Sequence, residues 1–337
     1  MIIPVKTNSG SYNIYLERGA LERAGQYFDL DRKVLVVTDS GVPKQYSEKI
    51  ASLAKKAVIS TFEMGEKSKN IDTFTSLLKV MVENGFTRTD CVVAVGGGVV
   101  GDVAGFVASA YMRGIDFYNI PTTVLSQVDS SIGGKTAIDF MGIKNIVGAF
   151  YPPKGVLIDP DTLKTLPDRQ ISNGLSEAVK SAMIGDAELF EIFEKCDIHQ
   201  NIDTIIERSL LVKRYVVETD EKESGLRKTL NFGHTLGHAV ESASQLDLLY
   251  HGECVSIGMV PMCTPEIRER LLPILRKLNL PTETDLKADC LVDALRHDKK
   301  ASGDSITVVF VSEIGKAELK RMPFSEYETM VRKVLNK

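Results

Sequence analysis

The stretch "CVVAVGGGVVGDVAGFVAS", residues 91–109, decides the fold class of this 337-residue chain. A valine-rich run leads into three successive glycines, and a helix-like pattern follows. Glycines let the backbone approach a ligand closely, and a helix amino terminus offers free N–H groups to a phosphate. The stretch alone fits either a nucleotide-binding turn or a tightly packed strand-to-helix turn.

Similar apolar runs and helical patterns alternate over the first 160 residues. The runs 33–39, 56–63, 91–98, 116–123 and 155–160 predict strands that are mostly buried on both faces, with helices over 42–54, 71–84 and 99–112 between them. Such alternation indicates a mostly parallel α/β sheet. Residues 135–139 and 145–150 could instead form a local antiparallel pair. Asp39, at a strand end, suits ribose hydroxyls or a plain turn.

Helical patterns dominate after residue 160. They cover 168–184, 186–196, 200–219, 231–245, 251–262 and 264–278, with one β-like run at 305–311. We therefore predict a Rossmann-like nucleotide-binding α/β domain over 1–162, followed by a mostly α-helical domain over 163–337 that binds metal and substrate.

Composition narrows the class of protein. The formal net charge is −4 and the lysines are dispersed, which argues against a nucleic-acid partner. The first residues do not match a signal peptide, and no run of about 18 apolar residues predicts a membrane span. The five cysteines are widely spaced without a Cys-x-x-Cys motif, which is typical of reduced thiols. We expect a soluble, cytoplasmic protein.

Histidines raise the question of a metal site. His234 and His238 lie four residues apart in "NFGHTLGHAVES", but Thr235 stands where a helical protease motif needs glutamate. Glu177, His234 and His251, on three predicted helices, could form a His₂Glu zinc site with one open position. His238 would then contact substrate. The alternative is that each residue is an ordinary surface or core side chain.

Charged residues near glycines suggest an anion site. Asp129, Lys135, Lys144 and Asn145 surround "GG" at 133–134, and lysines in such a loop suit a phosphate or carboxylate. Arg227 and Asn231 stand about two turns and one turn before His234, and are expected on or near its face. Any one of these side chains could equally be a solvated surface group.

The motifs taken together resemble the 3-dehydroquinate synthase family. The segments occur in the family's order across most of the chain: "GEKSKN", "VGGGVVGDVAGFVAS", "YMRG", "IPTTVLSQVDSSIGGKTAID", "KNIVGAF", "LIDPDTLKTLP", "GLSEAVK", "LNFGHTLGHA", "HGE" and "HDKK". Their number makes the resemblance specific.

The resemblance implies a role for each matching residue. Zinc, or cobalt, would be held by Glu177, His234 and His251. NAD would be contacted by Asp39, Glu66, Lys69, Gly97, Gly98, Asp102, Thr122, Thr123, Asp129, Lys135, Lys144, Thr162 and Thr165. Lys213 and Arg227 would hold the substrate carboxylate. The phosphate would meet Lys135, Asn145, His238, Lys299 or Lys300, and Arg113 from a second subunit. Asp129, Lys144, Lys180, Glu223 and Asn231 would complete the pocket; the catalytic set is Lys135, Lys180, Asn145, His238, Glu223 and Asn231.

The resemblance also implies an activity. A homodimer would convert 3-deoxy-D-arabino-heptulosonate 7-phosphate to 3-dehydroquinate and phosphate in the shikimate pathway, by transient oxidation with NAD, phosphate elimination, re-reduction and aldol closure. Two alternatives remain: another sugar phosphate cyclase, such as 2-deoxy-scyllo-inosose synthase, and a metal-dependent alcohol or glycerol dehydrogenase. The segment after Val260 is shorter than the family pattern, and Pro261 and Pro265 disturb its helix.

Overall fold

The computed structural model describes residues 1–244, 249–286, 289–292, 295 and 305–335. The chain divides into two compact units, Met1–Pro167 and Asp168–Lys337. No helix among the described residues is long and apolar enough to cross a membrane. The units separate five residues after the 162/163 boundary expected from the sequence, because the 3₁₀ helix η5 (Pro160–Thr165) bonds to the first unit: Thr165 Oγ1 lies 3.0 Å from the Tyr46 hydroxyl.

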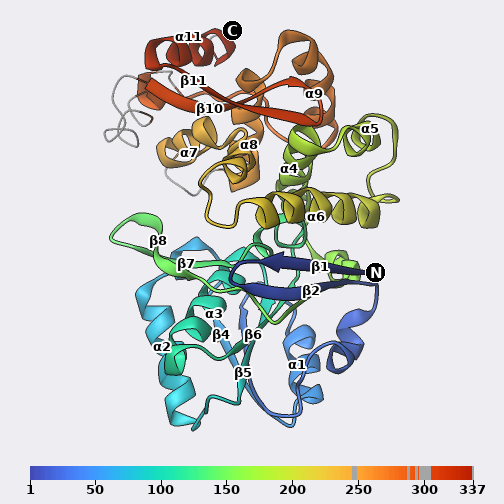
Figure 1. Ribbon diagram of the computed structural model, residues 1–337, viewed down its shortest axis with the longest axis vertical. Helices are drawn as coiled ribbons and strands as arrows, with labels where there is room; N and C mark the ends of the chain where they lie inside the picture. Colours follow the sequence, from blue (N-terminus) through green and yellow to red (C-terminus); the bar gives the residue numbers. More distant parts are fainter. Residues whose placement is uncertain (245–248, 287–288, 293–294, 296–304, 336–337) are drawn as a thin grey trace. The chain divides into compact units, whose positions relative to one another are not determined.

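The first unit is built on a seven-stranded sheet in the order β1-β2-β9-β6-β5-β3-β4 (Figure 1). All neighbours are parallel except β1 and β2. The strands are β1 (Ile2–Thr7), β2 (Gly10–Leu16), β3 (Lys33–Asp39), β4 (Lys56–Phe62), β5 (Cys91–Gly96), β6 (Asp116–Pro121) and β9 (Gly155–Ile158). The five predicted strands are confirmed. The hairpin β1–β2 was not predicted from the sequence.

Both faces of the sheet are covered by helices. Val34 and Val36 of β3 pack with η1 (Ala20–Gln26) and α1 (Lys44–Leu53), whereas Leu35 and Val37 pack with α2 (Ile71–Glu83) and α3 (Gly98–Ala110). This alternation explains why the middle of β3 is apolar on both faces. The prediction that 56–63 is buried on both faces is wrong, because β4 is the edge strand and is only half-buried.

The sheet has a topological switch point between β3 and β5. From β3 the chain moves outward to β4, then returns to β5 and continues through β6 to β9. In open α/β sheets ligands bind outside the carboxyl ends of the strands at such a point. Asp39 ends β3 and Gly96 ends β5, so both flank the place where this fold takes its ligands.

A second hairpin lies apart from the main sheet. β7 (Lys135–Phe140) and β8 (Ile143–Phe150) pair antiparallel, which confirms the local excursion. Met141 and Gly142 join them with φ values of 51° and 78°, the positive values that a two-residue type I′ turn requires.

The second unit is mostly helical, as predicted. Its helices are α4 (Asp168–Gly185), α5 (Ala187–Lys195), α6 (Ile202–Thr219), α7 (His234–Ala243), α8 (His251–Met259), α9 (Pro265–Lys277) and α11 (Phe324–Leu335). The antiparallel pair β10 (Ser305–Glu313) and β11 (Lys316–Pro323) completes it (Figure 1). Neither β11 nor α11 was predicted.

Two predicted helices differ from those observed. The stretch 231–245 is not one helix. The 3₁₀ helix η6 (Leu226–Asn231) ends at Asn231, and Gly233, at φ 78°, interrupts the helical conformation before α7 begins. Arg227 and Asn231 therefore do not continue the His234 helix. The stretch 251–262 also divides, because α8 passes into the 3₁₀ turn η7 (Val260–Met262), which contains Pro261.

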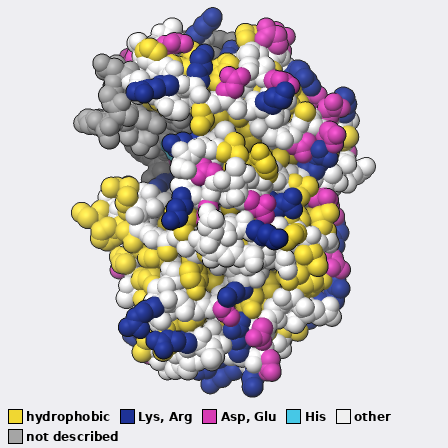
Figure 2. Space-filling view, viewed as in Figure 1, with side chains coloured by type: hydrophobic (Ala, Val, Ile, Leu, Met, Phe, Trp, Pro, Cys, Tyr) yellow, Lys and Arg dark blue, Asp and Glu magenta, His cyan; other side chains and the backbone are white. Residues whose placement is uncertain are grey.

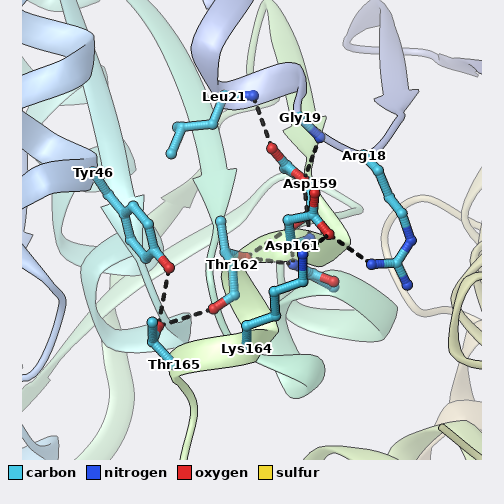
Figure 3. Close-up of polar contacts among 10 residues, drawn as sticks. Arg18, Gly19, Leu21, Tyr46, Asp159, Asp161, Thr162, Lys164 and Thr165 are labelled. Atoms are coloured by element: carbon cyan, nitrogen blue, oxygen red, sulfur yellow. Dashed lines mark hydrogen bonds and ion pairs between the residues drawn. The ribbon is translucent and has the colours of Figure 1, made fainter.

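The buried carboxylate of Asp159, the residue after β9, binds the segment between β2 and η1. Asp159 accepts hydrogen bonds from the backbone N–H groups of Gly19 and Leu21, at 2.9 and 3.0 Å, and from that of Asp161 at 3.0 Å (Figure 3). A buried N–H without a partner is costly, so this side chain fixes the turn that leads from β2 into η1.

We expect Asp159→Ala to lower the free energy of unfolding by about 3 kcal/mol, because it leaves buried donors unpaired. Chemical denaturation followed by circular dichroism measures the change. The matched control is Asp161→Ala, whose exposed carboxylate pairs with Arg18 and Lys164 and should change stability by less than about 1 kcal/mol. Equal losses in the two variants would contradict this role.

Candidate metal and substrate site

Glu177, His234 and His251 meet in the second unit. Glu177 lies on α4, while His234 and His251 are the first residues of α7 and α8. Glu177 Oε1 is 3.6 Å from His234 Nε2 and 3.5 Å from His251 Nε2. One ligand atom from each of the three side chains lies within 4.8 Å of the others. Three segments that are distant in sequence therefore aim their donors at one point.

Glycines explain how the two histidines come together. A Cβ on Gly258 of α8 would lie 1.9 Å from the carbonyl oxygen of Gly233, and one on Gly237 of α7 would lie 3.1 Å from that of Cys254. The backbones of α7 and α8 are thus too close for side chains at their crossing. The start of α7 therefore lies against the end of α8, and this contact fixes the position of His234 relative to α8 and its first residue, His251.

α4 holds the start of α8 with a row of side chains spaced four residues apart. Arg169 forms two hydrogen bonds to Glu253 at 2.7 and 2.8 Å. Asn173 Oδ1 accepts the Gly252 N–H at 2.7 Å, and Glu177 is the next residue in the row. Residues at this spacing share one helix face, so the segment that anchors α8 also presents the carboxylate to His251.

The donor set fits a divalent metal. Glu177 is 1% exposed, and its Oε1 accepts no hydrogen bond, which is costly for a buried carboxylate. Tetrahedral zinc ligands at ordinary bond lengths lie roughly 3.4 Å apart, close to the observed separations. His234 Nδ1 lies 3.1 Å from the Phe232 carbonyl, so it donates there and leaves Nε2 for a metal. A cation at this point would satisfy all three groups.

The electrostatics keep these groups in different protonation states. Burial lowers the pKa of His234 to about 3, outweighing the attraction of Glu177. Burial also opposes the charge on His251, but Glu177 and Glu241 outweigh it and raise that pKa to about 9. Burial works against the charged form of Glu177 too, yet Lys180 and the histidines hold its pKa well below the usual range. The carboxylate is therefore ionised and ready to bind a cation.

Two further side chains border the three donors. His238 is exposed, and its ring centroid lies 5.4 Å from that of His234 and 5.9 Å from that of His251. Glu241 Oε2 is 3.7 Å from His251 Nδ1, an arrangement that orients a metal-binding imidazole. The sequence analysis missed Glu241, although its position seven residues after His234 on one helix was a usable signal.

Three of the cationic residues predicted for the site are buried in the second unit. Lys180 makes an ion pair with Glu177 Oε2. Lys213 on α6 and Arg227 on η6 are 6% and 3% exposed. The Arg227 guanidinium donates to the Glu221 carbonyl, and Asn231 Nδ2 donates to Glu223 Oε1 at 2.8 Å. Lys299 and Lys300 lie outside the described residues.

The residues predicted for the nucleotide are in the first unit. Gly97 precedes α3 and Gly98 begins it; a Cβ on either would press on the side chains of Thr123 or Ser130, at 3.2 and 3.1 Å. Glycine at both positions lets the start of α3 approach these side chains closely. Asp39 accepts the Gly41 N–H at 2.9 Å; burial raises its pKa, and backbone hydrogen bonds oppose this.

The remaining predicted residues of this unit fall into two groups. Thr122, Thr162 and Thr165 bond within the unit: the Thr122 N–H donates to Gly96 O, Thr162 Oγ1 accepts from Gln127, and Thr165 meets Tyr46 (Figure 3). The others lie before α3, on or just after α3, and on or just before the second hairpin. They are Glu66 and Lys69 by η2 (Glu66–Ser68), Asp102 on α3, Arg113 after α3, Asp129 on η4 (Ser126–Ser130), and Lys135, Lys144 and Asn145 on β7–β8.

Two family models match consecutive parts of the chain. The model described as 3-dehydroquinate synthase N-terminal matches residues 59–173, and the one described as 3-dehydroquinate synthase C-terminal matches residues 174–301. The chain belongs to the 3-dehydroquinate synthase family. The 3-dehydroquinate synthase of Streptococcus thermophilus (strain CNRZ 1066) is 44% identical over 355 positions, covering 99% of this chain and 100% of the relative. Those positions outnumber the 337 residues here, so the relative has residues that this chain lacks.

Solved structures of other cyclases have the same fold. A 2-deoxy-scyllo-inosose synthase, complexed with carbaglucose-6-phosphate, NAD⁺ and Co²⁺, matches with a TM-score of 0.89 at 27% identity, over 99% of this chain and 100% of that one. The 2-epi-5-epi-valiolone synthase of Streptomyces hygroscopicus subsp. jinggangensis 5008, with NAD⁺ and Zn²⁺ bound, matches with a TM-score of 0.86 at 28% identity, over 96% of each chain.

We expect Gly258→Ala to weaken zinc binding at least tenfold, because the new methyl group would separate α7 from α8 and draw His234 away from His251. Competition with a chromophoric chelator measures the affinity. Gly25→Ala is the matched control, since its Cβ would meet nothing within 4 Å. Unchanged zinc affinity in a folded Gly258→Ala protein would show that the close approach does not build the site.

Proposed function

We propose that this protein is a 3-dehydroquinate synthase that uses NAD and a divalent metal, zinc or cobalt. The substrate would be 3-deoxy-D-arabino-heptulosonate 7-phosphate, and the products 3-dehydroquinate and phosphate. The observation that carries the proposal is the convergence of Glu177, His234 and His251 around an unpaired carboxylate oxygen, in a chain 44% identical to a 3-dehydroquinate synthase.

The metal, held by these three residues, would supply a Lewis acid that eases loss of the proton from the substrate hydroxyl to be oxidised. NAD, held by the residues assigned to it below, would supply a reversible hydride acceptor for that carbon. The chain's own residues hold the substrate and move protons. Lys180, buried beside Glu177, keeps positive charge next to the reacting oxygen. His238, exposed one turn after His234, would hydrogen-bond the departing phosphate and take part in its proton relay.

The two ends of the substrate need different partners. We assign the carboxylate to Lys213 and Arg227, because a buried ammonium and guanidinium are stabilised by an anionic ligand. We assign the phosphate to Lys135, Asn145 and His238, with Lys299 or Lys300 and with Arg113 from a second copy of the chain. Glu223 and Asn231 complete the pocket. Held at both ends, the substrate is kept in reactive geometry.

We place NAD at the switch point of the first unit. The pyrophosphate would lie at Gly97 and Gly98, and the ribose hydroxyls at Asp39. Further contacts are assigned to Glu66, Lys69, Asp102, Thr122, Thr123, Asp129, Lys135, Lys144, Thr162 and Thr165. The glycines at the amino terminus of α3, where backbone N–H groups can meet a phosphate, support this assignment.

The second candidate function is that of another sugar phosphate cyclase, and the TM-score of 0.89 to a 2-deoxy-scyllo-inosose synthase favours it. Sugar phosphates such as glucose 6-phosphate carry no carboxylate. The buried pair Lys213 and Arg227 and the higher identity to the 3-dehydroquinate synthase both favour the keto-acid substrate.

The metal- and NAD-loaded protein should release one phosphate per molecule of 3-deoxy-D-arabino-heptulosonate 7-phosphate, without net formation of NADH. Phosphate is measured colorimetrically and NADH by absorbance. Release from glucose 6-phosphate or sedoheptulose 7-phosphate instead would establish the second candidate, and net NADH would indicate a dehydrogenase. In the same assay Glu177→Ala should lose zinc binding and turnover, whereas Glu188→Ala, at an exposed position on α5, should retain both. Full activity of Glu177→Ala would reject the metal centre.

We also propose that the protein is a homodimer and that the β7–β8 hairpin forms part of its interface. Phe140, Met141, Ile143, Ile146 and Phe150 are 42%, 86%, 56%, 57% and 46% exposed. Apolar side chains gather where this hairpin projects from the first unit (Figure 2). Contiguous exposed apolar groups of this kind mark interaction surfaces. β8 also offers an open strand edge, which a second β8 could pair across a two-fold axis.

Replacing Ile143 with lysine should weaken the dimer at least tenfold, because each interface would bury two uncompensated ammonium groups. Size-exclusion chromatography with light scattering over a range of concentrations measures the dissociation. Leu319→Lys, at a position on β11 that is 41% exposed, serves as the control. A wild-type monomer, or equal behaviour of the two variants, would rule out this interface.

A further inference from the structure

β8 carries an irregularity at the residues assigned to the substrate. The register passes from the pair Ile138–Val147 to the pair Phe140–Ile143, so that Asp139 alone faces residues 144–146. Asn145, in the middle of this bulge, has a φ of 54°, a conformation that asparagine tolerates better than most residues. Bulges next to active sites re-aim side chains, and this one sets the direction of Lys144 and Asn145.

Three hydrogen bonds close a ring between the bulge and Lys69. The Asn145 N–H donates to Asp139 Oδ1 at 2.8 Å, and the Asp139 N–H donates to the Lys69 carbonyl at 2.7 Å. Lys69 Nζ completes the ring by donating to Asn145 Oδ1 at 2.5 Å. The backbone of Asn145 is therefore held by the side chain of Asp139, and its side chain by that of Lys69.

The Lys69 ammonium is itself fixed by the residues assigned to NAD. It is 5% exposed, makes an ion pair of 2.6 Å with Asp102 on α3, and lies 3.9 Å from Glu66. Burial disfavours its charge, but Asp102 and Glu66 outweigh this and raise its pKa, so the group stays protonated. An ammonium has three donors, and Asp102 and Asn145 occupy two of them. Among the residues that the structure describes, no third hydrogen bond of this ammonium is observed, so one donor can meet a ligand without releasing Asn145.

We propose that Lys69 is a positioning residue for Asn145: it holds the bulge of β8 so that binding of NAD and binding of the phosphate group are coupled. This inference rests on the proposed function, which places NAD at Lys69 and phosphate at Asn145. NAD bound against Lys69 restrains the ammonium, and the restrained ammonium keeps Asn145 in place for phosphate. The coupling is reciprocal, so phosphate tightens NAD binding by the same factor.

A double-mutant cycle tests the coupling on the zinc-loaded protein. Lys69→Met, Asn145→Ala and the double variant are titrated by calorimetry with NAD and, in saturating NAD, with inorganic phosphate. Lys69→Met should weaken phosphate binding about tenfold in the wild-type background and less than about twofold in the Asn145→Ala background, because it acts through Asn145. It should weaken NAD binding in both backgrounds.

Lys79→Met, at an exposed lysine of α2, is the matched control and should bind both ligands as the wild type does. If Lys69→Met does not fold, Asp139→Ala loosens the bulge from the other side and should weaken phosphate but not NAD. Equal losses of phosphate affinity in both backgrounds, or unchanged affinity in Lys69→Met or Asp139→Ala, would overturn the proposal. Wild-type protein that binds both ligands yet releases no phosphate from the keto-acid substrate refutes the proposed function but leaves the coupling measurable.

Discussion

The candidate metal centre depends on how closely α7 and α8 approach each other. A methyl group at Gly258 would collide with the backbone of Gly233, so this crossing tolerates only glycine. Because His234 and His251 are the first residues of these helices, their separation follows from the crossing. Short, buried helices make better supports for a metal site than loops, since packing fixes their ends.

Glu177 supplies the third candidate ligand of this site. A fully buried carboxylate is expensive unless cations compensate it, and Lys180 and the two imidazoles keep the pKa of Glu177 low despite its burial. The oxygen left between the imidazoles is best satisfied by a divalent ion. The row Arg169, Asn173 and Glu177 shows that one helix face both anchors α8 and supplies this ligand. Binding energy and fold stability are therefore linked through α4.

In the first unit, the residues assigned to the nucleotide and those assigned to the substrate lie on different kinds of structure. The strand ends assigned to the nucleotide lie at the switch point of the mostly parallel sheet, where packing on both faces holds them in place. The residues assigned to the substrate lie instead on a hairpin outside that sheet, which carries a bulge and exposed apolar side chains. A hairpin with few partners of its own needs contacts such as Lys69 to hold it.

Several features could be predicted from the sequence because they depend on local patterns. Five strands with unbroken apolar runs, the glycine turn before α3 and the long helices of the second unit were all recovered. The predictions that failed concern features that are set by tertiary contacts. The hairpin β1–β2 and strand β11 were not recognised, and β4 was recognised as a strand but not as an exposed edge, because pairing and exposure depend on the rest of the fold. The His234 helix was begun too early because Gly233, in a left-handed conformation, stops what looks like continuous periodicity.

The sequence by itself determined the α/β and helical parts, the family and the three donors able to bind a metal, because these follow from periodicity and from residue types in a fixed order. Only the tertiary structure decided that Glu177, His234 and His251 meet. It also decided that Glu241 contacts Nδ1 of His251 and that Lys69 donates a hydrogen bond to Asn145. The physical reason is that such contacts join residues far apart in the chain. They arise from helix crossings and strand registers set by close packing, which a linear pattern does not encode.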